Sequence, residues 1–174
     1  GNNENGQINV PIDLENVISV SAGCYHSLAV KSDGTVEAWG RNDFGQSDIP
    51  DGLSNVVAVS AGYYHNLALI ADGTVIAWGA NSNSQIDIPD DLSDVIQIAT
   101  GSDYSLALKS DGTAISWGGG NDYQNSSLPN SLTDIMSIAS GGHHSMALLS
   151  DGSIISWGNN NFGQLETPEE LETL

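Results

Sequence analysis

Short runs of apolar and β-branched residues, separated by glycine and asparagine, recur along the whole chain. In HSLAVKSDGTVEAWG (residues 26–40), two such runs flank Ser-Asp-Gly, where glycine provides the positive φ of a tight hairpin turn. The run NVISVSAG (residues 16–23) precedes this hairpin, and GRNDFGQSDIP (residues 40–50) follows it as a loop leading into a short strand that proline ends. The pattern therefore predicts units of four antiparallel strands, the size of a small β-propeller blade.

The strands are apolar at successive positions, as in LALI (residues 67–70) and VIAW (residues 75–78). A strand with one face in water would alternate apolar and polar residues, so we expect each sheet to be covered on both faces. Blades stacked against one another would satisfy this requirement. A small residue in the middle strand would then allow close approach on one face, and a larger one would fill the other. These positions are Ala29, Ala68, Ala107 and Ala147, and Leu28, Leu67, Leu106 and Met146.

The unit occurs four times. Successive tryptophans (Trp39, Trp78, Trp117, Trp157) stand 39, 39 and 40 residues apart, and the strand-ending glycines and the Asp-Gly pairs keep the same steps. The extra residue can be placed between Trp117 and Pro129, which predicts a loop there. The predicted fold class is all-β, with tandem four-stranded propeller blades of about 39 residues in a single repeat domain, residues 1–174. The repeats are residues 18–56, 57–95, 96–135 and 136–174, after a partial repeat, an outer strand and loop, at residues 1–17.

Two kinds of side chain recur as candidate structural anchors, a tryptophan in all four units and a histidine in three of them. A tryptophan present in every copy favours packing at the blade edge over ligand stacking. The three histidines, each in a different blade, would be spread around a ring, which favours hydrogen bonding at the blade turn over a shared metal site. The anchors are Trp39, Trp78, Trp117 and Trp157, with His26, His65 and His144.

The two ends of the chain are copies of each other. GNNENGQINVPIDLENV (residues 1–17) aligns with GNNNFGQLETPEELETL (residues 158–174). We expect the strand near residues 6–10 to have no blade to complete within this chain, so that its edge is covered, blunted or shared. Either it pairs head to tail with another copy, in a ring or a filament, or the chain is part of a longer array. The candidate self-assembly residues are Gly6, Gln7, Ile8, Val10, Phe162 and Leu165.

Two further features of the ends carry predictions. Glu37 stands where the later units have isoleucine, and because burying a lone carboxylate is costly, we expect the first blade to be partly exposed. Thr167 and Pro168 resemble the cap and first turn of a helix.

Charge and missing motifs narrow the function. With 3 Lys and Arg against 22 Asp and Glu, the net charge is -19, which excludes nucleic acid as a partner and favours neutral, basic or cationic ones. No apolar run approaches the roughly eighteen residues of a membrane span, so no membrane insertion is expected.

An acidic chain poor in lysine suits an extracellular or cell-surface location. No catalytic, cofactor or metal motif occurs, and the Asp and Asn loops are better explained as turns than as calcium sites. We therefore expect no enzyme activity and no cofactor.

The pattern GxxHSLALxSDGTVxxWGxNxxGQ resembles the repeat of the regulator of chromosome condensation family, in particular its compact bacterial form, which includes a secreted inhibitor of β-lactamases. The resemblance implies a propeller, seven-bladed in known members, that works by protein contacts. Two positions depart from this pattern. The third unit has Tyr104 in place of the histidine, and the second unit has Ser84 where the first has Gly45. The nucleotide-exchange activity of the eukaryotic founder has no counterpart, because units of 39 residues leave no space for its inserted hairpin.

The expected function is a scaffold acting through protein contacts, including contacts with copies of itself. The variable residues after each strand-ending glycine should gather on one rim, and the candidate contact residues there are Tyr25, Tyr63, Tyr64, Asp103 and His143. One alternative is a soluble, inhibitor-like binding module. Another is a structural filament whose assembly depends on residues 1–17. An enzyme is the least supported class.

Overall fold

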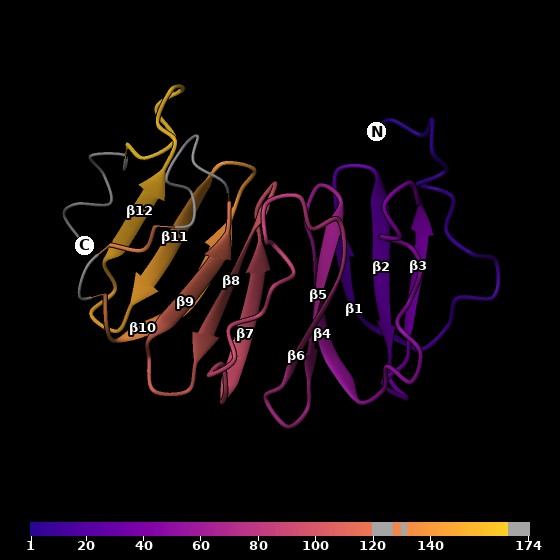
Figure 1. Ribbon diagram of the computed structural model, residues 1–174, viewed down its shortest axis with the longest axis horizontal. Coiled ribbons are helices and arrows are strands. Elements are labelled where there is room, and N and C mark those ends of the chain that lie inside the picture. The colour runs from indigo at the N-terminus through magenta and orange to yellow at the C-terminus, as the bar shows by residue number, and fades with distance from the viewer. Residues whose placement is uncertain (120–126, 130–131, 167–174) are drawn as a thin grey trace.

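The computed structural model describes residues 1–119, 127–129 and 132–166. Within these residues the secondary structure is all β, in four antiparallel sheets that each keep the chain order of their strands. Figure 1 shows the sheets side by side in chain order, with the first and the last at opposite ends of the row. Blade 1 is β1 (Val17–Ala22), β2 (His26–Lys31) and β3 (Val36–Gly40), and blade 2 is β4 (Val56–Ala61), β5 (His65–Ile70) and β6 (Val75–Gly79). Blade 3 is β7 (Val95–Thr100), β8 (Tyr104–Lys109) and β9 (Ala114–Gly118), and blade 4 is β10 (Ile135–Ser140), β11 (His144–Leu149) and β12 (Ile154–Gly158).

The all-β fold of tandem propeller blades is confirmed, but each sheet has three strands in the described residues rather than four. The segment expected to form a fourth strand folds into consecutive turns. Gly45 N–H donates to the Asn42 carbonyl at 3.2 Å, and Asp48 N–H donates to the Gly45 carbonyl at 3.1 Å. The Asn42 side chain closes the loop by donating to Asp48 Oδ1 at 2.7 Å. Because the loop satisfies its own backbone, it does not extend the sheet.

The hairpin turns follow the predicted chemistry. Gly34 has φ of 80°, which glycine adopts without strain. Asp33 Oδ1 accepts hydrogen bonds from the hydroxyl of Thr35 at 2.6 Å and from its backbone N–H at 3.0 Å. These bonds lower the pKa of Asp33, with the hydroxyl as the largest cause. The aspartates of this turn are therefore explained by the turn itself.

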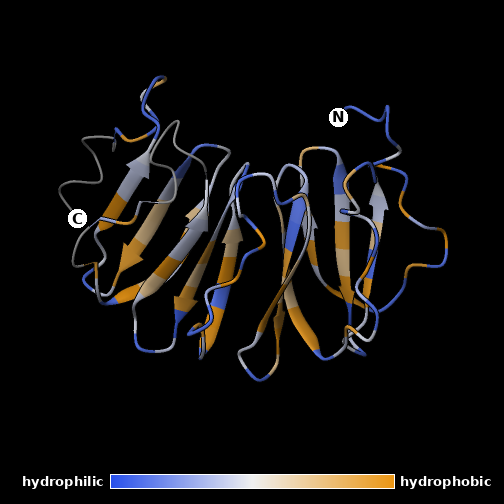
Figure 2. Ribbon diagram, in the orientation of Figure 1, coloured by the Kyte–Doolittle hydropathy of each residue, from blue (hydrophilic) through white to orange (hydrophobic). Residues whose placement is uncertain are grey.

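Blades 2 and 3 are covered on both faces. We call the face toward the following blade the downstream face and the one toward the preceding blade the upstream face. Between blades 1 and 2, the downstream residues Leu28, Val30 and Val36 pack on the upstream residues Val59 and Trp78. Equivalent apolar clusters lie between blades 2 and 3 and between blades 3 and 4. Figure 2 shows hydrophobic residues concentrated in the strands and hydrophilic ones in the loops.

Among the residues that the structure describes, none covers the two outermost faces of the row in this way. On the upstream face of blade 1, Val20 is 71% exposed, whereas its equivalent in blade 2, Val59, is 8% exposed. Glu37 is about half exposed and pairs with Lys31 at 3.4 Å. The prediction of a partly exposed first blade is therefore confirmed. On the downstream face of blade 4, Met146, Leu148 and Ile154 are 39%, 38% and 41% exposed.

The described ranges contain no helix that is long and apolar enough to cross a membrane. The predicted helix start at Thr167 and Pro168 and most of the loop between Trp117 and Pro129 lie outside the described residues.

Candidate functional site: the aromatic rim and the blade contacts

The loops between the first and second strands of successive blades lie next to one another along one edge of the row of blades. Backbone hydrogen bonds join them in sequence: Cys24 N–H to the Gly62 carbonyl at 3.2 Å, Tyr63 N–H to the Ser102 carbonyl at 3.2 Å, and Ser102 N–H to the Gly142 carbonyl at 2.8 Å. Each variable pair is thereby held beside that of the next blade.

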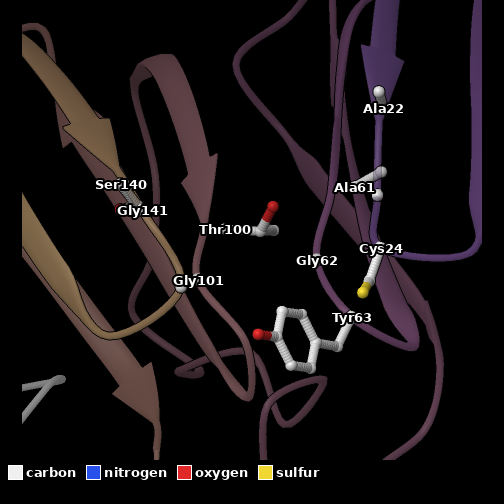
Figure 3. A pocket seen from close by; sticks show the side chains of 11 residues that line it. Ala22, Cys24, Ala61, Gly62, Tyr63, Thr100, Gly101, Ser140 and Gly141 are labelled. Carbon is white, nitrogen blue, oxygen red and sulfur yellow. The ribbon is translucent and has the colours of Figure 1, made fainter. Parts of the chain in front are cut away.

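A shallow pocket of about 180 Å³ opens between these strand ends. Figure 3 shows the ring of Tyr63 extending into the space between Cys24 of blade 1 and Gly101 of blade 3. The glycines that end the strands are required here, because a Cβ at Gly62 would collide with the His65 ring and the Gly101 carbonyl. The pocket is lined by Ala22, Gly23, Cys24, Ala61, Gly62, Tyr63, Thr100, Gly101, Ser140, Gly141 and Gly142.

Beside the pocket, five rings form a continuous aromatic cluster, which we call the aromatic rim. Tyr25 stacks on Tyr64 with centroids 5.7 Å apart. Phe44 and Tyr63 approach Tyr64 at 4.9 and 6.3 Å, and His143 approaches Tyr63 at 6.2 Å. Phe44 is 48% exposed and Tyr63 is 37% exposed, so the cluster is open to solvent. The rim therefore brings together residues of blades 1, 2 and 4.

Arg41 fixes part of this rim. Its guanidinium lies 5.3 Å from the centroids of both Tyr25 and Tyr64, and its Nε donates to Asp43 Oδ2 at 2.6 Å. The hydrogen bond to Asp43 is the main reason that the pKa of Arg41 is raised. The cation orders the two tyrosine rings through cation–π contacts.

The structure brings together four of the five rim residues expected from the sequence, and it adds two. Asp103 is half-buried at the equivalent position in blade 3, where its carbonyl accepts from Gly119 N–H at 2.8 Å. Phe44 and Arg41 were not expected, because they come from the loop after β3 rather than from the loop before β2. The sequence signal that could have found them is that GRNDFG combines an aromatic residue with one of the 3 cations of the chain.

The histidines lie between blades. His26 Nε2 is 2.6 Å from Asn66 Oδ1 of blade 2, and Asn66 Nδ2 donates to the Gln46 carbonyl at 2.8 Å. Trp78 Nε1 donates to the same carbonyl at 3.2 Å. A histidine of one blade, the loop that follows it and the tryptophan of the next blade thus form one hydrogen-bonded group.

The next two interfaces repeat the contact between the middle strands with different side chains, but among the described residues the Nε1 atoms of Trp117 and Trp157 have no hydrogen-bond partner. His65 Nε2 is 3.2 Å from Ser105 Oγ, which donates to the Gln85 carbonyl at 2.7 Å. In blade 3 the hydroxyl of Tyr104 replaces the imidazole and lies 2.8 Å from Ser145 Oγ. The departure at Tyr104 therefore preserves the contact to the following blade.

Burial favours the neutral form of His26 and His65. Desolvation lowers the pKa of His65 to about 4 and also lowers that of His26. His144 is half-buried in blade 4, where no described blade follows it. The described residues contain no group of three or more His, Cys, Asp or Glu side chains placed to hold a metal ion.

The same arrangement corrects the interpretation of the N-terminal segment. The Gln7 carbonyl accepts hydrogen bonds from Ser27 Oγ at 2.8 Å and from Trp39 Nε1 at 2.9 Å, and Gln7 is 8% exposed. Residues 6–10 therefore do have a blade within this chain, blade 1, and they meet it through a carbonyl rather than as a strand. The end without a blade among the described residues is the C-terminal one, where Phe162 is 94% exposed.

Four stacked antiparallel blades with an aromatic rim define the chain as a propeller-type scaffold, a class of protein that generally acts by binding other proteins. The family model of the regulator of chromosome condensation (RCC1) repeat matches residues 17–46, 56–85, 95–124 and 135–164. The chain belongs to this family. No curated protein matches it significantly.

Solved structures agree on the fold. The yeast RCC1 protein (Prp20), in its complex with Kap60, is 28% identical with a TM-score of 0.73, over 94% of this chain and 48% of that chain. The ectodomain of the Arabidopsis thaliana receptor kinase ACR4 is 25% identical with a TM-score of 0.69, over 82% of this chain and 50% of that one. Human WBSCR16 is 22% identical with a TM-score of 0.71, over 87% of this chain and 50% of that chain. The chain therefore spans about half the length of these proteins.

Proposed function

We propose that this protein is a non-enzymatic scaffold that binds a protein partner through the aromatic rim. The observation that carries the proposal is the contact cluster of Tyr25, Tyr63, Tyr64, Phe44 and His143, which is open at one end of the blades. Tyrosine and phenylalanine provide large contact areas at low entropic cost, which is why aromatic residues dominate protein interfaces. The yeast relative in complex with Kap60 supports a protein partner for this type of propeller.

The charge of the chain indicates the chemistry of the partner. A net charge of -19 repels acidic surfaces and attracts basic ones. Arg41 already lies over two rim tyrosines, so the rim accepts a guanidinium at close range. We propose a partner that presents basic and apolar side chains, and an extracellular or cell-surface location. The likeness to a receptor ectodomain supports that location.

Replacing Tyr63 and Tyr64 together with alanine is expected to weaken partner binding at least tenfold, because the double change removes the centre of the rim. Peptides selected from a randomised display library on the immobilised chain serve as the probe, and their affinities for wild type and variant are measured by fluorescence anisotropy. Phe162→Ala is the matched control, because Phe162 is a 94% exposed aromatic residue outside the rim. Selected peptides that bind the double variant as tightly as wild type would contradict the proposal.

A second candidate function, self-association, rests on a separate observation. In the described part of the chain, the downstream face of blade 4 and the upstream face of blade 1 are uncovered, and these are the two halves of the interface that joins its own blades. Head-to-tail contact between copies would cover both faces, in a closed ring or in an open filament. In a filament the protein would serve as a structural subunit.

A further inference from the structure

The two end segments of the chain have the same local conformation. Gly6 and Gly163 have φ of 74° and 75°, the same left-handed conformation as Gly45 between blades 1 and 2, with φ of 74°. The Asn3 side chain accepts from Ile8 N–H at 3.1 Å, and the Asn160 side chain accepts from Leu165 N–H at 2.9 Å. The C-terminal segment therefore already holds the shape in which the N-terminal segment contacts a blade.

Their environments differ. We call the donors Ser27 Oγ and Trp39 Nε1 on blade 1 the docking site, and in this chain the Gln7 carbonyl occupies it. In blade 2 the equivalent donors bind the Gln46 carbonyl, which belongs to the segment that leaves the preceding blade. Gln164 is the matching residue after blade 4, and its carbonyl has no donor among the described residues. Among the described residues, the segments of residues 1–10 and 158–166 are thus of one kind, and one docking site is seen for the two of them.

The surfaces around the docking site match as well. At each internal interface, the histidine or tyrosine that begins the middle strand of one blade forms a hydrogen bond with the second residue of the middle strand of the next blade. His26 bonds to Asn66 in this way, and Tyr104 bonds to Ser145. For blade 4 followed by blade 1, this pair would be His144 and Ser27. The exposed Met146 would then cover Val20, as Leu28 packs against Val59 in the cluster between blades 1 and 2.

We propose that the docking site on blade 1 is the binding site for residues 158–166 of a second copy of this chain, and that residues 1–10 occupy it in cis as an intramolecular competitor. This proposal rests on the self-association proposed above, and it identifies the segment that regulates that self-association. Ser27 and Trp39 donate to a single carbonyl, so the two segments exclude each other. Because a tethered segment acts at an effective concentration of about millimolar, the cis segment holds the chain mainly in the unassociated state.

The test uses matched variants of the full chain. Asn3→Ala/Gly6→Val removes the side-chain acceptor of the N-terminal turn and places a β-branched residue at positive φ, which strains that segment and releases the docking site. Asn160→Ala/Gly163→Val makes the same two changes in the C-terminal segment, and a fourth protein carries all four substitutions. Self-association is measured for the four proteins by sedimentation velocity over a concentration series, and circular dichroism verifies that each is folded.

We expect Asn3→Ala/Gly6→Val to self-associate with a dissociation constant at least tenfold lower than that of wild type. The C-terminal variant and the fourfold variant are expected to stay monomeric, and excess peptide of residues 158–166 is expected to dissociate the N-terminal variant. The proposal is overturned if the N-terminal variant associates no more strongly than wild type, or if the fourfold variant associates as strongly as the N-terminal one. Equal association of all four proteins at high concentration would overturn the competitor role of residues 1–10 and leave self-association standing, whereas no association by any of them would overturn both.

Discussion

Replacing Leu67 with alanine is expected to lower the free energy of unfolding by about 3 kcal/mol. Leu67 is fully buried between blades 2 and 3, in a cluster that includes Val95, Ile98 and Trp117. The change removes apolar contact on the downstream face of blade 2 and leaves a cavity that stacked sheets cannot fill by collapsing. Urea unfolding followed by tryptophan fluorescence measures the difference.

Met146→Ala is the matched comparison, because Met146 holds the same position in blade 4. Its side chain is 39% exposed, and we expect its loss to cost less than about 1 kcal/mol. A similar cost at both positions would contradict the assignment of the stabilising energy to blade contacts. A larger cost at Met146 only at high protein concentration would instead indicate that a second copy covers the face.

The repeat pattern was sufficient to predict the blades. The glycines, Asp-Gly pairs and tryptophans recur at one period, and runs such as LALI are apolar on both faces. Only stacked sheets satisfy both observations, and the structure has them. The fourth strand could not be predicted reliably, since GRNDFGQSDIP contains asparagine and aspartate side chains that satisfy backbone groups locally. Such side chains compete with sheet pairing, and at residues 42–48 the turns prevail.

The rim and the ends show where sequence reasoning stops. Residues at the same place in each repeat, such as Tyr25 and Tyr64, could be grouped because the period places them on one rim. Arg41 and Phe44 belong to a different loop, and only the three-dimensional path of that loop brings them to Tyr64. The copied ends could be recognised from the sequence. Which of the two end segments contacts a blade depends on a structural fact: the loop after one blade packs against the following blade. The sequence pattern alone does not reveal this contact.

Acidification from pH 7.5 to pH 5 is expected to destabilise the fold by about 2 kcal/mol through His65 alone. The pKa of His65 is about 4 in the folded chain, against 6.5 for an unperturbed histidine, because burial between blades 2 and 3 disfavours the charged form. Between these two values the unfolded chain binds more protons than the folded chain, so stability falls as the pH decreases through 6.5 and levels off below about 4. The lowered pKa of His26 acts in the same direction.

The variant His65→Tyr separates this contribution from the others, and the chain itself provides the precedent. Tyr104 takes the histidine position in blade 3 and reaches Ser145 of the next blade at 2.8 Å, as His65 reaches Ser105. Burial raises the pKa of Tyr104, so a tyrosine at this position does not titrate in the acidic range. We expect urea unfolding between pH 7.5 and 5 to show a slope for His65→Tyr that is smaller than that of wild type by up to about 1.4 kcal/mol per pH unit. Unchanged slopes would show that His65 is not the titrating group, and the loss of stability would then have to come from His26 or from surface carboxylates.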